Sequence, residues 1–228
     1  ALGVIQITGT SAALDLNAAI TSATSLSVSG VSDLGANVTT SAGGSYGQYY
    51  QGHVILSANI ILSGGLSNQI IFKYGISDSS AYDLTIQDSR SVDFQQSFNL
   101  GNLIIYNTSN VEIDNGGIAL SIYTDNLSPV SFKGNITTTN TQFYNSSIEV
   151  TGPANATSIL TGSLINISST LSGGFYKNSV AIIGNLYLDG DITGFENITV
   201  TDTAGNNTGV VTLDINDSAY ATALTIDT

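Results

Sequence analysis

Short apolar runs separated by turn residues extend along the whole chain. In the run 118–123, Ile118, Leu120 and Ile122 occupy every second position, so they lie on one side of an extended strand. Helical periodicity is almost absent, whereas period-two alternation recurs, and this pattern predicts an all-β protein. The clearest predicted strands span residues 69–74, 82–87, 100–106, 117–124, 142–151, 180–189, 195–201 and 209–215.

Turn signals rich in glycine and asparagine recur about every ten residues, for example at 43–44, 64–65, 115–117 and 173–174. Short strands at this spacing favour an antiparallel β-sandwich. A parallel β-helix, whose coils contain about 20 residues, is the alternative, and the Asn-punctuated stretch 100–150 fits it as well. We find no repeat regular enough to prefer the β-helix, so the sandwich is the predicted fold.

Residues 11–20 fit two different structures. Ser11 is a suitable N-cap for a short helix that would bury Leu16 and Ile20. Alternatively, Leu14, Leu16 and Ile20 share one face of a half-buried strand. The segment is too short for periodicity to decide between the two.

The first predicted strand is apolar on both of its faces. Leu2 and Val4 fall on one face, and Ile5 and Ile7 fall on the other. A strand of this kind needs cover on both sides. It is therefore either an ordinary first strand of its own domain or a donor strand that inserts into a neighbouring subunit.

The charge of the chain limits its partners. Charged residues make up only 9% of the sequence, and 17 carboxylates against four Lys and Arg give a net charge of −13. Nucleic-acid binding is not expected, because phosphate contacts need clustered Lys and Arg. The longest apolar runs, 53–62 and 180–188, are too short to form a membrane-spanning helix.

Two further features bear on the chemistry and the compartment of the protein, the first on its chemistry and the second on its compartment. The chain has no cysteine, which excludes disulfides, thiolate chemistry and cysteine-based metal sites. It begins at Ala1 without an initiator methionine, as a secreted chain does after its signal peptide is removed. We therefore expect an extracellular protein without a metal or other cofactor.

The sequon Asn-x-Ser/Thr, the acceptor for N-glycosylation, is the strongest motif signal. Chance would place about five sequons in a chain with 21 Asn among 228 residues, and this chain has ten. Five have a large apolar middle residue (Val38, Leu127, Ile136, Ile167 and Ile198), and if these point inward the asparagines face solvent. The alternative is the Asn- and Thr-rich polar face of a sheet. Covalent N-linked glycans are expected at Asn37, Asn107, Asn126, Asn135, Asn145, Asn155, Asn166, Asn197, Asn206 and Asn216.

Catalytic constellations are weak. His53, the only histidine, has no partner in the sequence and is interpreted as structural. Carboxylates recur every five residues from Asp78 to Asp93, so they alternate between strand faces and do not converge on one site for glycoside hydrolysis. Asp189 and Asp191 flank a glycine and fit a turn. We predict no catalytic residue and no metal site.

The lysines have two interpretations. Lys73, Lys133 and Lys177 each lie in or beside an apolar strand segment. Lysine at a strand edge protects against edge-to-edge aggregation, and this is the simpler interpretation. An isopeptide crosslink to a nearby Asn or Asp is the alternative.

The mature-looking start at residues 1–8, the ten sequons and the strand-rich body poor in Lys and Arg resemble the archaeal thread filaments of thermoacidophiles, a family of N-glycosylated surface pilins. The resemblance implies a helical homopolymer of identical subunits joined by donor-strand complementation, with a role in adhesion or biofilm formation and no enzymatic activity. It implies a donor-strand tail and linker at 1–22 and a β-rich head domain at 23–228. The donor residues would be Leu2, Val4, Ile5 and Ile7.

Two other functions stay open at this point. One is a non-polymerising surface adhesin or an S-layer-associated carbohydrate-binding β domain. The other is a β-helical glycan-active enzyme, which needs a cleft that holds two carboxylates at a hydrolytic separation.

Overall fold

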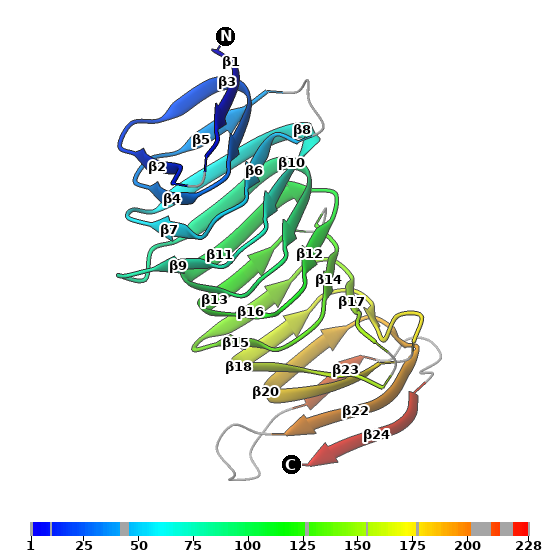
Figure 1. Ribbon diagram of the computed structural model, residues 1–228. Helices are drawn as coiled ribbons and strands as arrows, with labels where there is room; N and C mark the ends of the chain where they lie inside the picture. The colour runs from blue at the N-terminus through cyan, green and yellow to red at the C-terminus, as the bar shows by residue number, and fades with distance from the viewer. Residues whose placement is uncertain are drawn as a thin grey trace.

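The protein is a parallel β-solenoid of about nine coils (Figure 1). The computed structural model describes residues 2–9, 11–41, 46–125, 128–153, 155–176, 178–201, 211–214 and 221–227. Every regular element in these ranges is a β-strand, and all strand pairings are parallel. The coils stack into an elongated column with β1 at one end and β24 at the other (Figure 1).

The pairings define three faces, which we call A, B and C in the order in which the chain visits them. Face A contains β5 (Val38–Thr40), β16 (Thr141–Tyr144) and β23 (Val211–Asp214). Face B contains β6 (Gln48–Tyr50), β12 (Val111–Ile113), β14 (Val130–Phe132), β17 (Ile148–Val150), β19 (Leu171–Ser172) and β21 (Ile192–Thr193). Face C contains β2 (Ala13–Leu16), β4 (Val31–Leu34), β7 (Val54–Leu56), β9 (Ile76–Asp78), β15 (Ile136–Thr138), β22 (Phe195–Thr201) and β24 (Ala221–Asp227).

The remaining strands continue through a corner from one face to the next. Four turn from face A to face B: β1 (Leu2–Ile7), β3 (Ile20–Val28), β8 (Ile60–Phe72) and β10 (Leu84–Phe94). Four turn from face C to face A: β11 (Phe98–Thr108), β13 (Gly117–Thr124), β18 (Thr157–Ile167) and β20 (Ser179–Asp189).

The core consists of stacked side chains of similar kind. Alternation sends every second residue inward, and the parallel register places each inward residue above its partner in the next coil. Tyr50, Phe72 and Phe94 form such a stack, with ring centroids 5.3 and 5.2 Å apart and nearly parallel ring planes. Phe98 extends the stack, its ring centroid 5.5 Å from that of Phe94. All four rings are buried.

A buried glutamine–tyrosine pair connects neighbouring coils near one end of the solenoid. The Gln48 Nε2 donates to the carbonyl oxygens of Val38 and Ser63, at 3.2 and 3.0 Å. The Tyr50 hydroxyl donates to Gln48 Oε1 at 2.9 Å. All three hydrogen-bonding atoms of the glutamine amide and the tyrosine are thus used inside the core, as buried polar groups require.

The same arrangement recurs at a different corner of the solenoid. The Gln142 Nε2 donates to the carbonyl oxygens of Ile136 and Thr161, at 3.3 and 2.8 Å. The Tyr144 hydroxyl donates to Gln142 Oε1 at 3.0 Å. Both copies have the sequence Asn-Val/Ile-Thr-Thr, starting at Asn37 and Asn135, followed by Gln-Tyr/Phe-Tyr.

The predicted antiparallel β-sandwich is wrong, and the parallel β-helix kept as its alternative describes the fold. The all-β class is confirmed. Period-two alternation does not separate the two folds, because strands with one buried face alternate in both. Coil length also varies, since Leu62 lies 24 residues before its partner Ile86 and Ile86 lies 19 residues before its partner Ile105. Of the two structures considered for residues 11–20, the strand is observed, as β2.

The predicted donor strand is hydrogen-bonded into its own solenoid. β1 pairs in parallel with β3, with Leu2 beside Ala23 and Ile7 beside Val28. Donor-strand complementation is therefore wrong for this chain, because the strand that was predicted to leave the subunit forms its first coil. The predicted boundary between residues 22 and 23 falls within β3.

The side chains of β1 alternate in the same way as those of the other strands. Ile5 and Ile7 are partly buried against the core. Val4 points outward and is 60% exposed. Strand β1 is therefore apolar on both faces because Ile5 and Ile7 face the core and Val4 is an exposed apolar residue on the other face.

Candidate functional site

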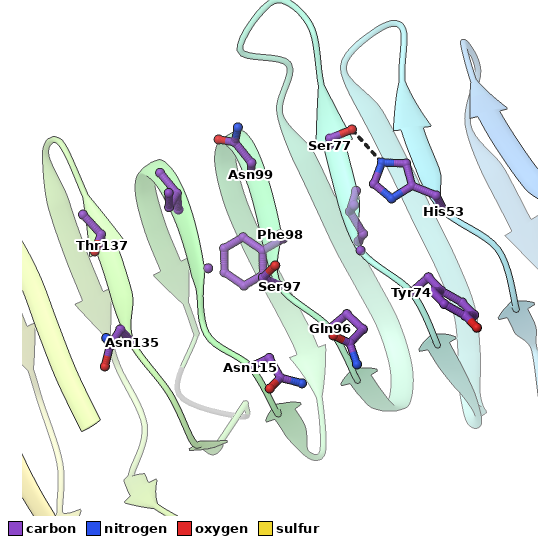
Figure 2. Close-up of a pocket in the computed structure, with 14 residues that line it drawn as sticks. His53, Tyr74, Ser77, Gln96, Ser97, Phe98, Asn99, Asn115, Asn135 and Thr137 are labelled. Carbon is purple, nitrogen blue, oxygen red and sulfur yellow. Dashed lines mark hydrogen bonds between the residues drawn. The ribbon is translucent and has the colours of Figure 1, made fainter. Parts of the chain in front are cut away.

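A groove of about 800 Å³ runs along the corner between faces B and C (Figure 2). Its volume is within the usual range for ligand sites. The lining residues come from successive coils, from the turn before β7 to β15. They are His53, Tyr74, Gly75, Ile76, Ser77, Gln96, Ser97, Phe98, Asn99, Asn115, Gly117, Ile118, Asn135 and Thr137.

The solenoid register builds one wall of the groove. Ser77 lies beside Asn99, Asn99 beside Ile118, and Ile118 beside Thr137, one residue from each coil. Adjacent parallel strands are about 4.8 Å apart, so the wall presents one outward side chain at each such step. The groove is therefore a periodic surface along the long axis of the protein.

Gly117 leaves room for the ring of Phe98, its partner residue in the preceding coil. A Cβ atom on residue 117 would lie 2.4 Å from the ring of Phe98 in the preceding coil. The ring of Phe98 is buried, so it cannot move away from an added side chain. The packing of the Phe98 ring thus depends on the absence of a side chain at Gly117.

His53 and Tyr74 border one end of the groove (Figure 2). The imidazole Nε2 of His53 forms a 2.8 Å hydrogen bond with the hydroxyl of Ser77 in the next coil. The Tyr74 side chain is 56% exposed, so its ring is accessible to a ligand. His53 thus lies on the surface of the groove, immediately before β7.

Uncharged hydrogen-bonding groups dominate the lining. None of the fourteen lining residues is Asp, Glu, Lys or Arg. A primary amide both donates and accepts hydrogen bonds, as a hydroxyl does. The amides belong to Gln96, Asn99, Asn115 and Asn135, and the aliphatic hydroxyls to Ser77, Ser97 and Thr137.

A second hollow of about 550 Å³ adjoins the groove. It shares Tyr74, Gln96 and Asn115 with the groove. Its other lining residues are Lys73, Gln95, Asp114 and Lys133. The Nζ of Lys133 is 2.8 Å from Asp114 Oδ1, and both side chains are partly exposed.

Lys73 and Lys133 lack the burial that the isopeptide alternative requires. Lys133 forms an ion pair at the surface, and Lys73 is exposed. Lys177 lies outside the described residues.

Carboxylates gather on face B next to this second hollow. Asp93 and Glu112 lie side by side in adjacent coils. Burial and then the charge of Asp114 raise the pKa of Asp93, and the hydrogen bond from Gln95 opposes this. Burial, Asp114 and Asp93 raise the pKa of Glu112. Asp93 Oδ1 is buried without a hydrogen-bond partner among the described residues.

Replacing Asp93 with asparagine should raise the melting temperature at pH 7 and leave it nearly unchanged at pH 3. Because the folded-state pKa of Asp93 is raised, the folded protein binds more protons than the unfolded chain between the two pKa values. This contribution to stability is complete below the ordinary pKa of 3.8 and is lost as pH rises through the folded value. Thermal melts of both proteins at each pH measure the effect. An equal shift at both pH values would show that the carboxylate charge is not its cause.

Two other carboxylates of the five-residue series, Asp78 and Asp83, accept hydrogen bonds from the backbone of the next coil. The carboxylate of Asp78 accepts from the backbone N–H groups of Ala81 and Gly101. Asp83 Oδ1 accepts from the backbone N–H of Asn102. These groups connect coils at corners of the solenoid and do not line the groove.

The sequons are distributed around the solenoid. The middle residues Val38, Ile136, Ile167 and Ile198 are buried. Asn37, Asn135, Asn155 and Asn197 are exposed, and Asn107, Asn145 and Asn166 are partly buried. Leu127 and the sequons at Asn126, Asn206 and Asn216 lie outside the described residues.

An aromatic stripe on the outside of face A is a competing surface. The rings of Tyr106, Tyr123 and Phe143 follow one another along successive coils, with centroids 5.6 Å apart at each step. Tyr106 is 41% exposed. None of these three rings lines the groove.

The groove escaped the sequence analysis because its residues are spread from position 53 to position 137. Only the register brings them together, and a sequence without a regular repeat does not reveal the register. The recurring Asn and Gln residues in the turns before β11, β13 and β15 were the available signal.

Comparisons with known proteins identify no relative of this chain. No protein-family model, no curated protein and no solved structure matches this chain. In the part of the chain that the structure describes, no helix is long and apolar enough to cross a bilayer. The fold and the site define a parallel β-solenoid with an amide-lined groove along its axis.

Proposed function

We propose that this protein is an extracellular glycan-binding module that holds an extended sugar chain in the groove between faces B and C. The observation that carries the proposal is the lining, which combines amide and hydroxyl groups with an accessible tyrosine ring and has no charged residue. This is the composition that a polyhydroxylated ligand requires, since each sugar hydroxyl both donates and accepts hydrogen bonds.

The shape of the groove also suits a glycan chain. Its wall repeats with the coil spacing of about 4.8 Å, so a ligand with its own repeating units meets a similar set of groups at each step. Tyr74 offers an exposed aromatic face on which the apolar side of a sugar ring can pack. The groove thus fits a chain of several units better than a single sugar.

The lining favours binding over hydrolysis. Glycoside hydrolysis ordinarily requires two carboxylates that flank the scissile bond. The fourteen lining residues include none. Asp93 and Glu112, which lie side by side, are not part of the groove.

Replacing Tyr74 with alanine should weaken binding to polysaccharides by about tenfold or more, because burial of an aromatic ring contributes about 1.5–3 kcal/mol. Asn99→Ala should weaken it several-fold, in line with the loss of one hydrogen bond worth about 1 kcal/mol. Affinity electrophoresis against a panel of soluble polysaccharides measures both effects.

The matched control is Tyr106→Ala, a tyrosine of similar exposure in the aromatic stripe of face A. It should leave binding unchanged. If Tyr106→Ala abolishes binding and Tyr74→Ala does not, the ligand binds on face A. If no polysaccharide in a broad panel binds the wild-type protein, the proposed function is wrong.

We also propose that N-glycans attach where the fold leaves the asparagine Nδ2 free. Asn37 and Asn135 accept hydrogen bonds with Oδ1, from the backbone N–H groups of Ile61 and Ile159, and both are exposed. Asn107, by contrast, donates through Nδ2 to Asp88 at 2.8 Å. Among the described residues, the nitrogen that would carry the sugar thus has no hydrogen-bond partner at the first two sites, and it is engaged at the third.

In vitro N-glycosylation of the folded protein should modify Asn37 and Asn135 and spare Asn107 and Asn145. The Nδ2 of Asn145 donates to the hydroxyl of Tyr123 at 3.2 Å. Site-resolved mass spectrometry of the folded and the urea-unfolded chain checks this, because unfolding should make all four equivalent. Equal modification of Asn107 in the folded protein would contradict the assignment.

A homopolymer of identical subunits is the second candidate, and the open edge of β1 favours it. Among the described strands β1 pairs only with β3, and Val4 beside this edge is exposed. Another copy could continue the sheet there by stacking a whole coil, as unpaired edges allow. Electron microscopy of concentrated protein should then show filaments, and particles of monomer size at every concentration would exclude it.

A further inference from the structure

Two of the few positively charged side chains of this protein lie next to the groove. The sequence has four Lys and Arg against 17 carboxylates. Two of the four, Lys73 and Lys133, line the hollow that adjoins the groove, together with a single carboxylate, Asp114. This hollow therefore has an excess of one positive charge among its lining residues, in a protein whose net charge is −13.

Lys73 carries that excess charge. The ammonium of Lys133 is already paired with Asp114 at 2.8 Å. Lys73 is exposed and forms no ion pair with any described residue. A flexible ammonium group of this kind can approach an anionic group of a ligand without first breaking another contact.

We propose that the glycan held in the groove is acidic and that Lys73 binds its anionic substituent, a carboxylate or a sulfate ester. The inference rests on the proposed function and specifies the ligand class of the same site. Tyr74 connects the two parts of the site, because it lines both the groove and the hollow. A sugar ring packed on Tyr74 places its substituents beside the adjacent residue, Lys73.

The rest of the groove has no charged lining residue, so the anionic group of the ligand is recognised only beside Lys73. Amide and hydroxyl groups contact the ring hydroxyls along the chain, and the anionic group is recognised at one end only. Since the protein as a whole is strongly acidic, its long-range field repels an anionic ligand. The preference for an acidic glycan should therefore come from the local contact with Lys73.

Binding to matched polysaccharides tests this inference. The probes are polygalacturonate and its fully methyl-esterified form, which differ in the carboxylate, and dextran sulfate and dextran, which differ in the sulfate. The wild-type protein should bind at least one acidic member about tenfold more tightly than its neutral partner, as expected for a charge-assisted hydrogen bond. The pair that shows the preference identifies the anionic group.

The Lys73→Gln variant should lose this preference and keep its affinity for the neutral member. Arg90→Gln is the matched control, since Arg90 is exposed and lines neither hollow. It should retain the preference. Equal affinity of the wild-type protein for both members of each pair, or a preference that survives in Lys73→Gln, would overturn the inference and leave the proposed function intact. Binding to none of the probes or other polysaccharides would overturn both.

Discussion

Replacing Gly116 with alanine should lower the melting temperature by on the order of 10 °C. The expected steric conflict costs about 4 kcal/mol. In a domain of this size, each kcal/mol lowers the melting temperature by about 2–4 °C. Gly116 has a φ of +71°, which favours glycine. A Cβ atom there would lie 1.9 Å from the carbonyl oxygen of Asn135 in the next coil. The obstacle is backbone, so the two coils would have to separate.

The matched control is the same substitution at Gly3, on the first strand. A Cβ atom on Gly3 meets no atom within 4 Å. Gly3→Ala should therefore change the melting temperature by no more than a degree or two. Thermal melts followed by circular dichroism compare the two variants, and equal shifts would contradict the tight stacking of the middle coils.

Replacing Phe72 with alanine should destabilise the protein by about 3–5 kcal/mol, the usual cost of removing a buried phenylalanine ring. Phe72 lies between Tyr50 and Phe94 in the aromatic stack and is 1% exposed. The loss leaves a cavity that separates the two remaining rings. Urea denaturation, followed by fluorescence of the tyrosines, measures the change.

Phe175→Ala is the control for this prediction, since Phe175 is 91% exposed. Its removal should change the free energy of unfolding by less than about 0.5 kcal/mol, as is usual for surface positions. A repeat protein can unfold in more than one step, so the midpoint of each transition is compared. If both variants lose the same stability, the aromatic stack does not hold the coils together.

The class of the fold was accessible from the sequence, and its topology was not. Alternating runs such as Ile118, Leu120 and Ile122 identified strands correctly, although the structure places Ile118 and Leu120 outward and Ile122 inward. β13 turns the corner from face C to face A between them, which reverses the side that faces the core. Period-two alternation is interrupted in a similar way in β3, β8, β10, β11 and β18, which also continue through a corner.

The repeat that would have favoured a solenoid is present but sparse. The sequence Asn-Val/Ile-Thr-Thr followed by Gln-Tyr/Phe-Tyr occurs twice, starting at Asn37 and Asn135. In both copies the asparagine Oδ1 accepts from the backbone of the next coil, and the glutamine and tyrosine form the buried pair. Two of the ten sequons thus have a structural reason for their asparagine, besides any role in glycosylation.

The candidate site depends on information that only the register supplies. His53 was interpreted from sequence as a residue without a partner, and its hydrogen-bond partner Ser77 lies one coil away. Lys73 was interpreted as protection of a strand edge, and its place beside the groove follows from the stacking of the coils. Neither the hydrogen bond of His53 nor the position of Lys73 beside the groove can be inferred from residue spacing, because the coils differ in length.

The most direct test of the glycan-binding groove is a nuclear magnetic resonance titration of the isotope-labelled protein with an oligogalacturonide and with a neutral oligodextran. The side-chain amide signals of Gln96, Asn99 and Asn115 should shift on binding, because these groups line the groove. Shifts confined to residues around Tyr106 and Tyr123 on face A, or the absence of any shift with both ligands, would contradict the account.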